Sequence, residues 1–122
     1  MKARYFQRGE SIDYTPQTDI EAGMPVFLGQ LAGVTKLDIG AGQLGAIAVV
    51  GVYSVVKDSS AFTAGVPVYW NETSQQATAT PTAKYLGLAV EAAATGDETV
   101  KVLLNAGQSA YDASKESSNS GN

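Results

Sequence analysis

The chain has 122 residues, a formal net charge of −4 at neutral pH and a pI of about 4.6. This length fits one domain or two small repeated lobes, and the acidic balance argues against a nucleic-acid partner, since such proteins present a basic surface to the phosphates. The sequence has no cysteine and no histidine, which removes disulfides, thiolate and imidazole ligands and the commonest general base. We therefore expect no catalytic residue, no metal site and no cofactor.

Residues 1–8 are predicted to form a basic arm. The charges of this arm are all positive, whereas the rest of the chain has five basic and twelve acidic side chains. A frayed terminus is one interpretation, because most chain ends are loose. The other is an anchor that meets acidic protein surface and buries its aromatic rings. The candidate contact residues are Lys2, Arg4, Tyr5, Phe6 and Arg8.

Residues 9–105 are predicted to form an all-β body, a small barrel-like or sandwich-like module. Short runs rich in Val, Ile, Leu and Tyr end about every 8 to 12 residues at Gly, Asp, Asn or Ser, which is typical of strands. The turn Thr95-Gly96-Asp97 predicts a hairpin. The expected strands are residues 10–14, 24–28, 31–37, 44–50, 51–56, 66–70, 76–80, 84–91 and 98–104.

The body contains a candidate internal repeat. AGMPV at 22–26 recurs as AGVPV at 64–68, an offset of 42 residues. The repeated halves would span about 20–57 and 62–104. A chain rich in Ala and Gly also produces such matches by chance, so both duplication and coincidence fit the sequence.

In both copies a proline, Pro25 or Pro67, is the second residue of an expected strand. A proline cannot donate a hydrogen bond to a neighbouring strand, so it is found at a strand start or on a sheet edge. Open edges can pair with another chain. Pro25 and Pro67 are therefore candidate subunit contacts.

The segment from Gly40 to Gly45 matches the dinucleotide-binding pattern G-x-G-x-x-G. That function requires a helix directly after the glycines, so that the phosphates meet the helix N-terminus. Here a β-type run follows instead, and we interpret the glycines as a turn. An enzyme or nucleotide binder is kept only as a third hypothesis.

Alternation along residues 66–70 separates Trp70 and Tyr69. Val66, Val68 and Trp70 would share one face of the strand, with Pro67 and Tyr69 on the other. We expect Trp70 to fill the core and take Tyr69 as a candidate contact. Residues 106–122 are a polar, Ser/Asn-rich tail whose composition alone is that of a disordered segment.

Seven short patterns occur in a fixed order along the chain. They are G-x-x-I-x-Y-T at 9–15, I-x-A-G-x-P-V at 20–26, D-I-x-x-G-x-L-G at 38–45, a G-V segment ending in lysine at 51–57, A-G-x-P-V-Y-W at 64–70, L-G-L-A at 86–89 and G-D-x-T-V-K-V-L-L-N at 96–105. In order and spacing the set resembles the small capsid decoration, or cement, proteins of tailed bacteriophages, across about residues 5–105.

The resemblance implies a β-barrel-like module on the outside of an icosahedral shell, often as a trimer. The partners would be the major capsid protein and further copies of this chain, without catalysis or cofactor. The first hypothesis is thus a cement protein that stabilises the shell. The alternative is a virion-surface module that binds host glycans, for which Tyr69, Tyr85 and Tyr53 are the candidate aromatic residues.

The expected location is the outer surface of the virion, after synthesis in the host cytoplasm. No apolar run approaches the roughly 18 residues of a membrane helix. The first residues also lack the apolar stretch of a signal peptide. We therefore expect no membrane partner.

Overall fold

The computed structural model describes residues 2–4, 9–81 and 83–107, and these form an all-β fold without a helix. Each expected strand has an observed counterpart whose ends differ by at most two residues, so the predicted fold class is confirmed. The strands are Ser11–Tyr14 (β1), Pro25–Leu28 (β2), Leu31–Thr35 (β3), Gly45–Ala48 (β4), Val52–Val56 (β5), Pro67–Asn71 (β6), Gln76–Thr78 (β7), Lys84–Ala89 (β8) and Thr99–Leu104 (β9).

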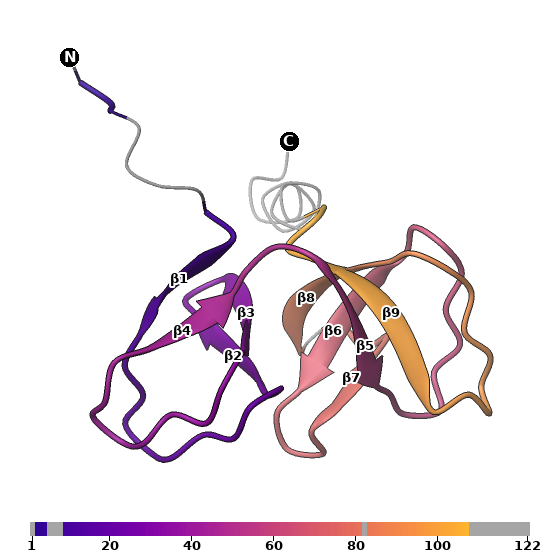
Figure 1. Ribbon diagram of the computed structural model, residues 1–122. Coiled ribbons are helices and arrows are strands. Elements are labelled where there is room, and N and C mark those ends of the chain that lie inside the picture. Colours follow the sequence, from indigo (N-terminus) through magenta and orange to yellow (C-terminus); the bar gives the residue numbers. More distant parts are fainter. Residues whose placement is uncertain (1, 5–8, 82, 108–122) are drawn as a thin grey trace, which may run out of the picture.

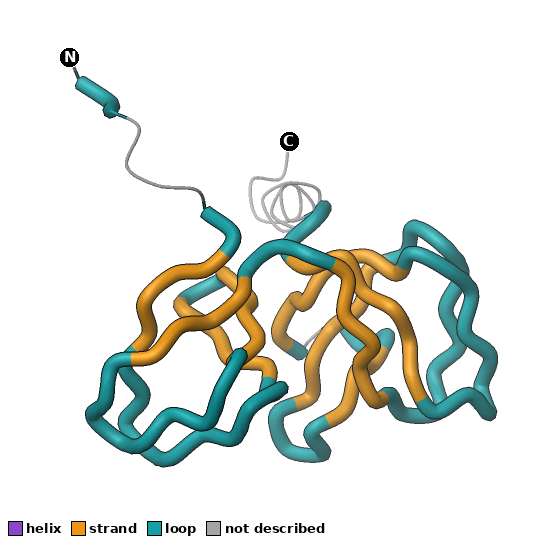
Figure 2. The backbone as a smooth tube through the Cα atoms, in the orientation of Figure 1, coloured by secondary structure: helices purple, strands orange, loops and turns teal. Residues whose placement is uncertain are grey.

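The strands form two antiparallel sheets that lie side by side (Figure 1). The first sheet has the order β1-β4-β3-β2 and the second the order β5-β9-β8-β6-β7. The chain crosses from one sheet to the other in the short connection between β4 and β5 (Figure 2). A bridge between Lys57 and Ala77 draws together the two edges of the second sheet. Neither sheet is closed into a barrel.

Side-chain alternation builds the core. In β9, Val100, Val102 and Leu104 are buried, while the residues between them are exposed. Successive side chains of a strand point to opposite faces of the sheet, so one face of β9 is apolar and the other meets solvent. The main apolar cluster includes Ala32 and Val34 of β3 together with residues of the second sheet. The two sheets therefore share this cluster, and the first sheet has a second, smaller cluster of its own around Val26, Ile47 and Val49.

The second sheet repeats the backbone hydrogen bonds of the first. In the first sheet the Gly23 N–H donates to the Thr35 carbonyl, and in the second the Gly65 N–H donates to the Ala89 carbonyl. The two donors are 42 residues apart and the two acceptors 54, and the extra 12 residues accommodate the added strand β7. Four hydrogen bonds correspond in this way, written as donor–acceptor with the first sheet before the second: Val49–Glu10 with Leu104–Gly51, Ile20–Ile39 with Phe62–Ala93, Gly23–Thr35 with Gly65–Ala89, and Gln43–Gly40 with Asp97–Ala94.

The two sheets differ in extent from the expected halves, 20–57 and 62–104, and the duplication itself stays a prediction. β1 pairs with β4, and β5 pairs with β9. The first sheet therefore includes β1, and the second begins at β5 and not after Lys57. An ungapped offset could not reveal these limits, because the spacing changes where β7 is inserted.

Asn105 links the first sheet to the second. Its backbone N–H donates to the Leu86 carbonyl of its own sheet at 2.9 Å. Its side-chain Oδ1 accepts from the Ala32 N–H, and Nδ2 donates to the carbonyl oxygens of Ala32 and Val49, all at 2.8 Å. β3 pairs with β4 only C-terminal to Ala32. The Asn105 amide thus occupies the position of the strand neighbour that Ala32 lacks on that side.

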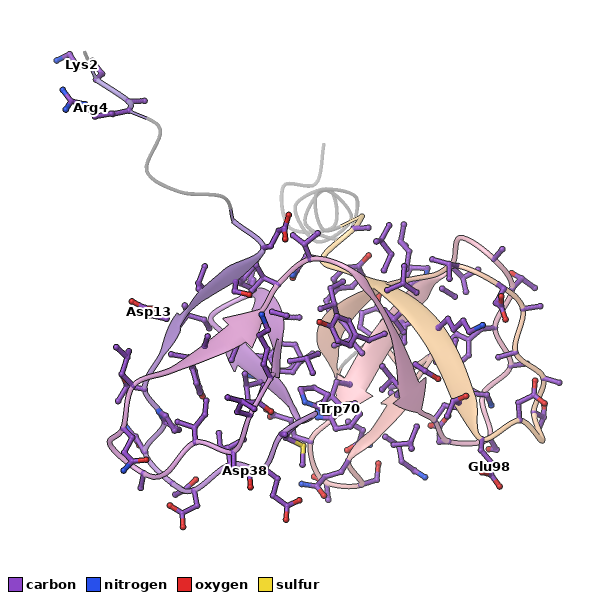
Figure 3. The ribbon with its side chains drawn as sticks, in the orientation of Figure 1. Lys2, Arg4, Asp13, Asp38, Trp70 and Glu98 are labelled. Atoms are coloured by element: carbon purple, nitrogen blue, oxygen red, sulfur yellow. The ribbon has the colours of Figure 1, made fainter. Side chains whose placement is uncertain are left out.

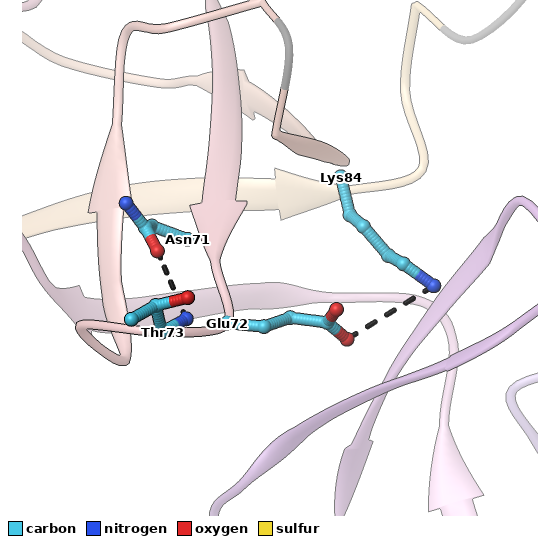
Figure 4. A network of polar contacts seen from close by, with 4 residues as sticks. All are labelled: Asn71, Glu72, Thr73 and Lys84. Atoms are coloured by element: carbon cyan, nitrogen blue, oxygen red, sulfur yellow. Dashed lines mark hydrogen bonds and ion pairs between the residues drawn. The ribbon is translucent and has the colours of Figure 1, made fainter.

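Lys84 makes a second link between the sheets. Its Nζ lies 5.4 Å from the centroid of the Phe27 ring in β2 and 4.0 Å from a carboxylate oxygen of Glu72. Glu72 belongs to the β6–β7 turn, where Asn71 Oδ1 accepts from the Thr73 N–H at 2.9 Å (Figure 4). The lysine and the glutamate are both about half exposed, so their ion pair contributes about 1 kcal/mol at most.

Candidate interaction surfaces

Of the predicted arm residues, the structure describes Lys2 and Arg4. Both are exposed, and Figure 3 draws them away from the two sheets. Tyr5, Phe6 and Arg8 lie outside the described residues. The arm as a contact element therefore stays a prediction.

Pro25 and Pro67 both begin a strand, as predicted, but only one of them is on an edge. Gly23 and Gly65 precede them with φ of 77° and 87°, a backbone conformation that favours glycine. Pro25 begins β2, which is an edge strand. The expectation of an edge at Pro67 is wrong, because β6 lies between β8 and β7.

The position of Pro67 within β6 explains why a proline is tolerated in an internal strand. β7 pairs only with Tyr69–Asn71. Pro67 therefore lies beyond the end of β7, and its missing N–H costs no hydrogen bond on that side.

Tyr69 is not on the surface. Its side chain packs edge-to-face against Tyr85, with ring centroids 5.5 Å apart, and both residues are buried. The Tyr85 hydroxyl donates to the Ala106 carbonyl, and burial, with a smaller effect of Tyr69, raises the pKa of Tyr85 to about 12. The expectation that Tyr69 is an exposed contact residue is therefore wrong. The segment after β9 contacts the side of the sheet on which Tyr69 and Tyr85 pack. Trp70 lies in the core, as predicted.

The glycine-rich segment forms a turn, as predicted. The Gln43 N–H donates to the Gly40 carbonyl at 3.0 Å, and Gly42 has φ of 76°. Strand β4 begins at Gly45. The helix N-terminus on which a dinucleotide pyrophosphate would bind is thus replaced by a strand.

A groove runs between the two sheets and was not foreseen from the sequence. Its apolar part is a cavity of about 560 Å³, and Figure 3 shows Trp70 in this region between the sheets. An adjoining cavity of about 760 Å³ shares Met24 and Gln75 with the first. We call the two together the interlobe groove. Side chains of the apolar part include Met24, Pro25, Val34, Tyr53, Val55 and Trp70.

The adjoining part of the interlobe groove is acidic. Asp19, Glu21 and Asp38 line it. Asp19 Oδ1 accepts from the Ala41 N–H and Asp38 Oδ1 from the Ala22 N–H, both at 2.8 Å. These bonds hold two of the three carboxylates in place at the loops that enclose this part of the groove.

A second surface is an apolar row across the second sheet. Val52, Leu103, Leu88 and Pro67 are successive cross-strand neighbours on β5, β9, β8 and β6. Val52 is 53% exposed and Leu103 is 38% exposed. Pro67 is exposed and Leu88 is half-buried, so the row is partly exposed, and contiguous apolar surface of this kind is typical of association surfaces.

The described residues contain no group of three or more His, Cys, Asp and Glu side chains placed to hold a metal ion. No helix long and apolar enough to cross a membrane is found among them.

Comparison with known proteins identifies a family. The family model described as phage cement protein matches residues 6–104, which covers both sheets. No curated protein and no solved structure matches the chain. The match spans well over half of the sequence and both sheets of the fold. The chain therefore belongs to the phage cement protein family.

Proposed function

We propose that the protein binds the outer surface of a bacteriophage capsid and stabilises the shell, without catalysing a reaction. The observation that carries this proposal is the match of the cement family across residues 6–104. A cement protein acts by presenting surface to its neighbours, and the features described above are of that kind: an open edge at β2, an exposed apolar row and a basic arm.

The partners in this proposal are the major capsid protein and further copies of the chain. A homo-oligomer is proposed, with a trimer favoured, located on the outside of the virion after synthesis in the host cytoplasm. The edge strand β2, which begins at Pro25, supports contact between copies, because no other strand of the described residues pairs with its outer side. The apolar row supports it too, since an apolar surface becomes more stable when it is buried.

The glycan-binding alternative is not retained. It depended on an exposed cluster of Tyr69, Tyr85 and Tyr53. Tyr69 and Tyr85 are buried, and Tyr53 is partly buried against the core. Sugar-binding sites of the expected type need accessible aromatic faces, and these rings do not provide them.

Co-sedimentation with empty capsids tests the proposal. The protein should pellet with shells in a saturable manner, and the decorated shells should stay intact at a higher temperature than bare ones. An unrelated acidic protein of similar size is the control and should stay in the supernatant. If the protein fails to pellet with the shells of every phage tested, at all salt concentrations, capsid binding is refuted.

A further inference from the structure

The interlobe groove combines two chemistries along one continuous surface. Its apolar part presents Met24 and Trp70, and its acidic part presents three carboxylates on two loops. Met24 and Gln75 line both parts, so an extended peptide could contact the two together. A ligand that fits must therefore be apolar or aromatic at one point and basic beside it.

The N-terminal arm of this chain has that pattern. In an extended strand, alternate residues share a face, so Lys2, Arg4 and Phe6 would lie on one side, with spacings of about 6.6 Å. A phenylalanine ring suits a site lined by methionine sulfur and an indole. The neighbouring positive charges suit carboxylates. The arm thus offers an aromatic ring for the apolar part of the groove and positive charges for its acidic part.

We propose that the N-terminal arm of a second copy of this chain docks in the interlobe groove, with Phe6 against Met24 and Trp70. This inference rests on the homo-oligomer in the proposed function and names the contact that would hold it. In a ring of copies, each arm would enter the groove of the next copy, which is a head-to-tail arrangement that closes.

The position of the arm favours a second copy over the arm's own groove. Figure 3 shows Lys2 and Arg4 at one end of the molecule and Asp38, on an acidic loop of the groove, at the opposite end. At about 3.3 Å per residue, an extended arm carries Phe6 about 10 Å and Lys2 about 23 Å beyond Gly9. These lengths are enough to reach the groove of a copy that packs directly against this one.

Charge also sets the direction of the arm. The three carboxylates line only the adjoining part of the groove, whereas Lys36 lines the apolar part and donates from its Nζ to Ser11 Oγ at 3.2 Å. The end of the arm with Lys2 and Arg4 therefore lies over the carboxylates of Asp19, Glu21 and Asp38. Such exposed pairs are screened by salt, so docking should weaken as ionic strength rises.

Trp70 makes the proposal directly measurable, since it is the only tryptophan in the chain and it lines the groove. The probe is a synthetic peptide of residues 1–9 added in excess to a dilute solution of the full chain, with tryptophan excited selectively. We expect a saturable change in Trp70 emission that becomes smaller at high salt. A peptide with Phe6→Ala should bind about tenfold more weakly or worse, because it lacks the aromatic anchor.

Two protein variants test where the peptide binds. Glu21→Gln removes a carboxylate of the groove and should weaken the peptide. Glu98→Gln removes a distant exposed carboxylate and should leave binding unchanged (Figure 3). The proposal is overturned if Trp70 emission does not respond, if the Phe6→Ala peptide binds equally well, or if both protein variants have the same effect.

The outcome also separates this contact from capsid binding. If the peptide binds empty capsids instead of the full chain, the arm is a capsid contact, so the docking proposal fails while the proposed function stands. If the peptide binds the groove but the protein does not pellet with shells, the proposed function fails and the contact between copies stands.

Discussion

Replacing Asn105 tests how the two sheets are held together. Asn105→Ala removes three hydrogen bonds, each 2.8 Å long, to backbone groups of Ala32 and Val49. Both partner residues are buried, so water cannot readily replace the lost donor and acceptor. Asn105 also has φ of 62°, in the left-handed region, where alanine is less stable than asparagine.

The expected loss for Asn105→Ala is about 3–5 kcal/mol. Three hydrogen bonds of net worth about 1 kcal/mol each account for most of it, and about 1–2 kcal/mol comes from an alanine in the left-handed region. Small domains have a free energy of unfolding of about 5–15 kcal/mol in total. At about 4 °C per kcal/mol for a chain of this length, the melting temperature should fall by roughly 12–20 °C.

The assay is thermal or urea unfolding of the full chain, followed by circular dichroism. Asn71→Ala is a matched control: its Oδ1 also accepts from two backbone N–H groups, but in an exposed turn, so it should cost only about 1 kcal/mol. Asn105→Gly loses the same hydrogen bonds without the backbone strain and should be more stable than Asn105→Ala, the reverse of the usual order.

Asn105→Asp adds a pH test. The carbonyl oxygens of Ala32 and Val49 now accept hydrogen bonds from the Asn105 Nδ2. An ionised carboxylate has no hydrogen to donate, so it would place another acceptor oxygen against them. A protonated carboxyl can donate to one of them. This variant should therefore gain stability relative to Asn105→Ala as the pH falls. The reasoning is refuted if Asn105→Ala melts within about 2 °C of the parent, or if it is more stable than Asn105→Gly.

Four further substitutions, one of them a control, have defined outcomes. Gly87→Ala should be strongly destabilising in urea unfolding, because a Cβ there would collide with the Leu103 carbonyl oxygen, whereas Gly96→Ala, where a Cβ meets nothing within 4 Å, should be nearly neutral. Trp70→Ala should cost about 3–5 kcal/mol as a core truncation, and normal melting would contradict that role. The folded-state pKa of Tyr85 is raised to about 12, so the stability that it contributes is present below its unfolded pKa of about 10 and is lost as the pH rises toward 12. Tyr85→Phe should flatten this alkaline loss, and an unchanged alkaline transition would contradict it.

Local pattern was enough to predict the strands. In β9, exposed and buried residues alternate from Thr99 to Leu104, and polar and apolar residues alternate from Thr99 to Val102, with the exposed Leu103 as the exception. The turn before β9 was predicted from Thr95-Gly96-Asp97, and the Asp97 N–H indeed donates to the Ala94 carbonyl. Strand propensity, turn chemistry and the restricted backbone of proline act over a few residues, so they can be deduced without knowing which strands are neighbours.

The tertiary structure decided everything that depends on which strands are neighbours. Pro67 lies in an internal strand because β7 is inserted beside β6. Tyr69 is buried because Tyr85 packs against it, and Asn105 reaches a residue 73 positions away. The interlobe groove likewise joins Met24 to Trp70 across two sheets. These contacts arise only when distant segments pack together, and the period of a strand predicts which face is apolar but not what will cover it.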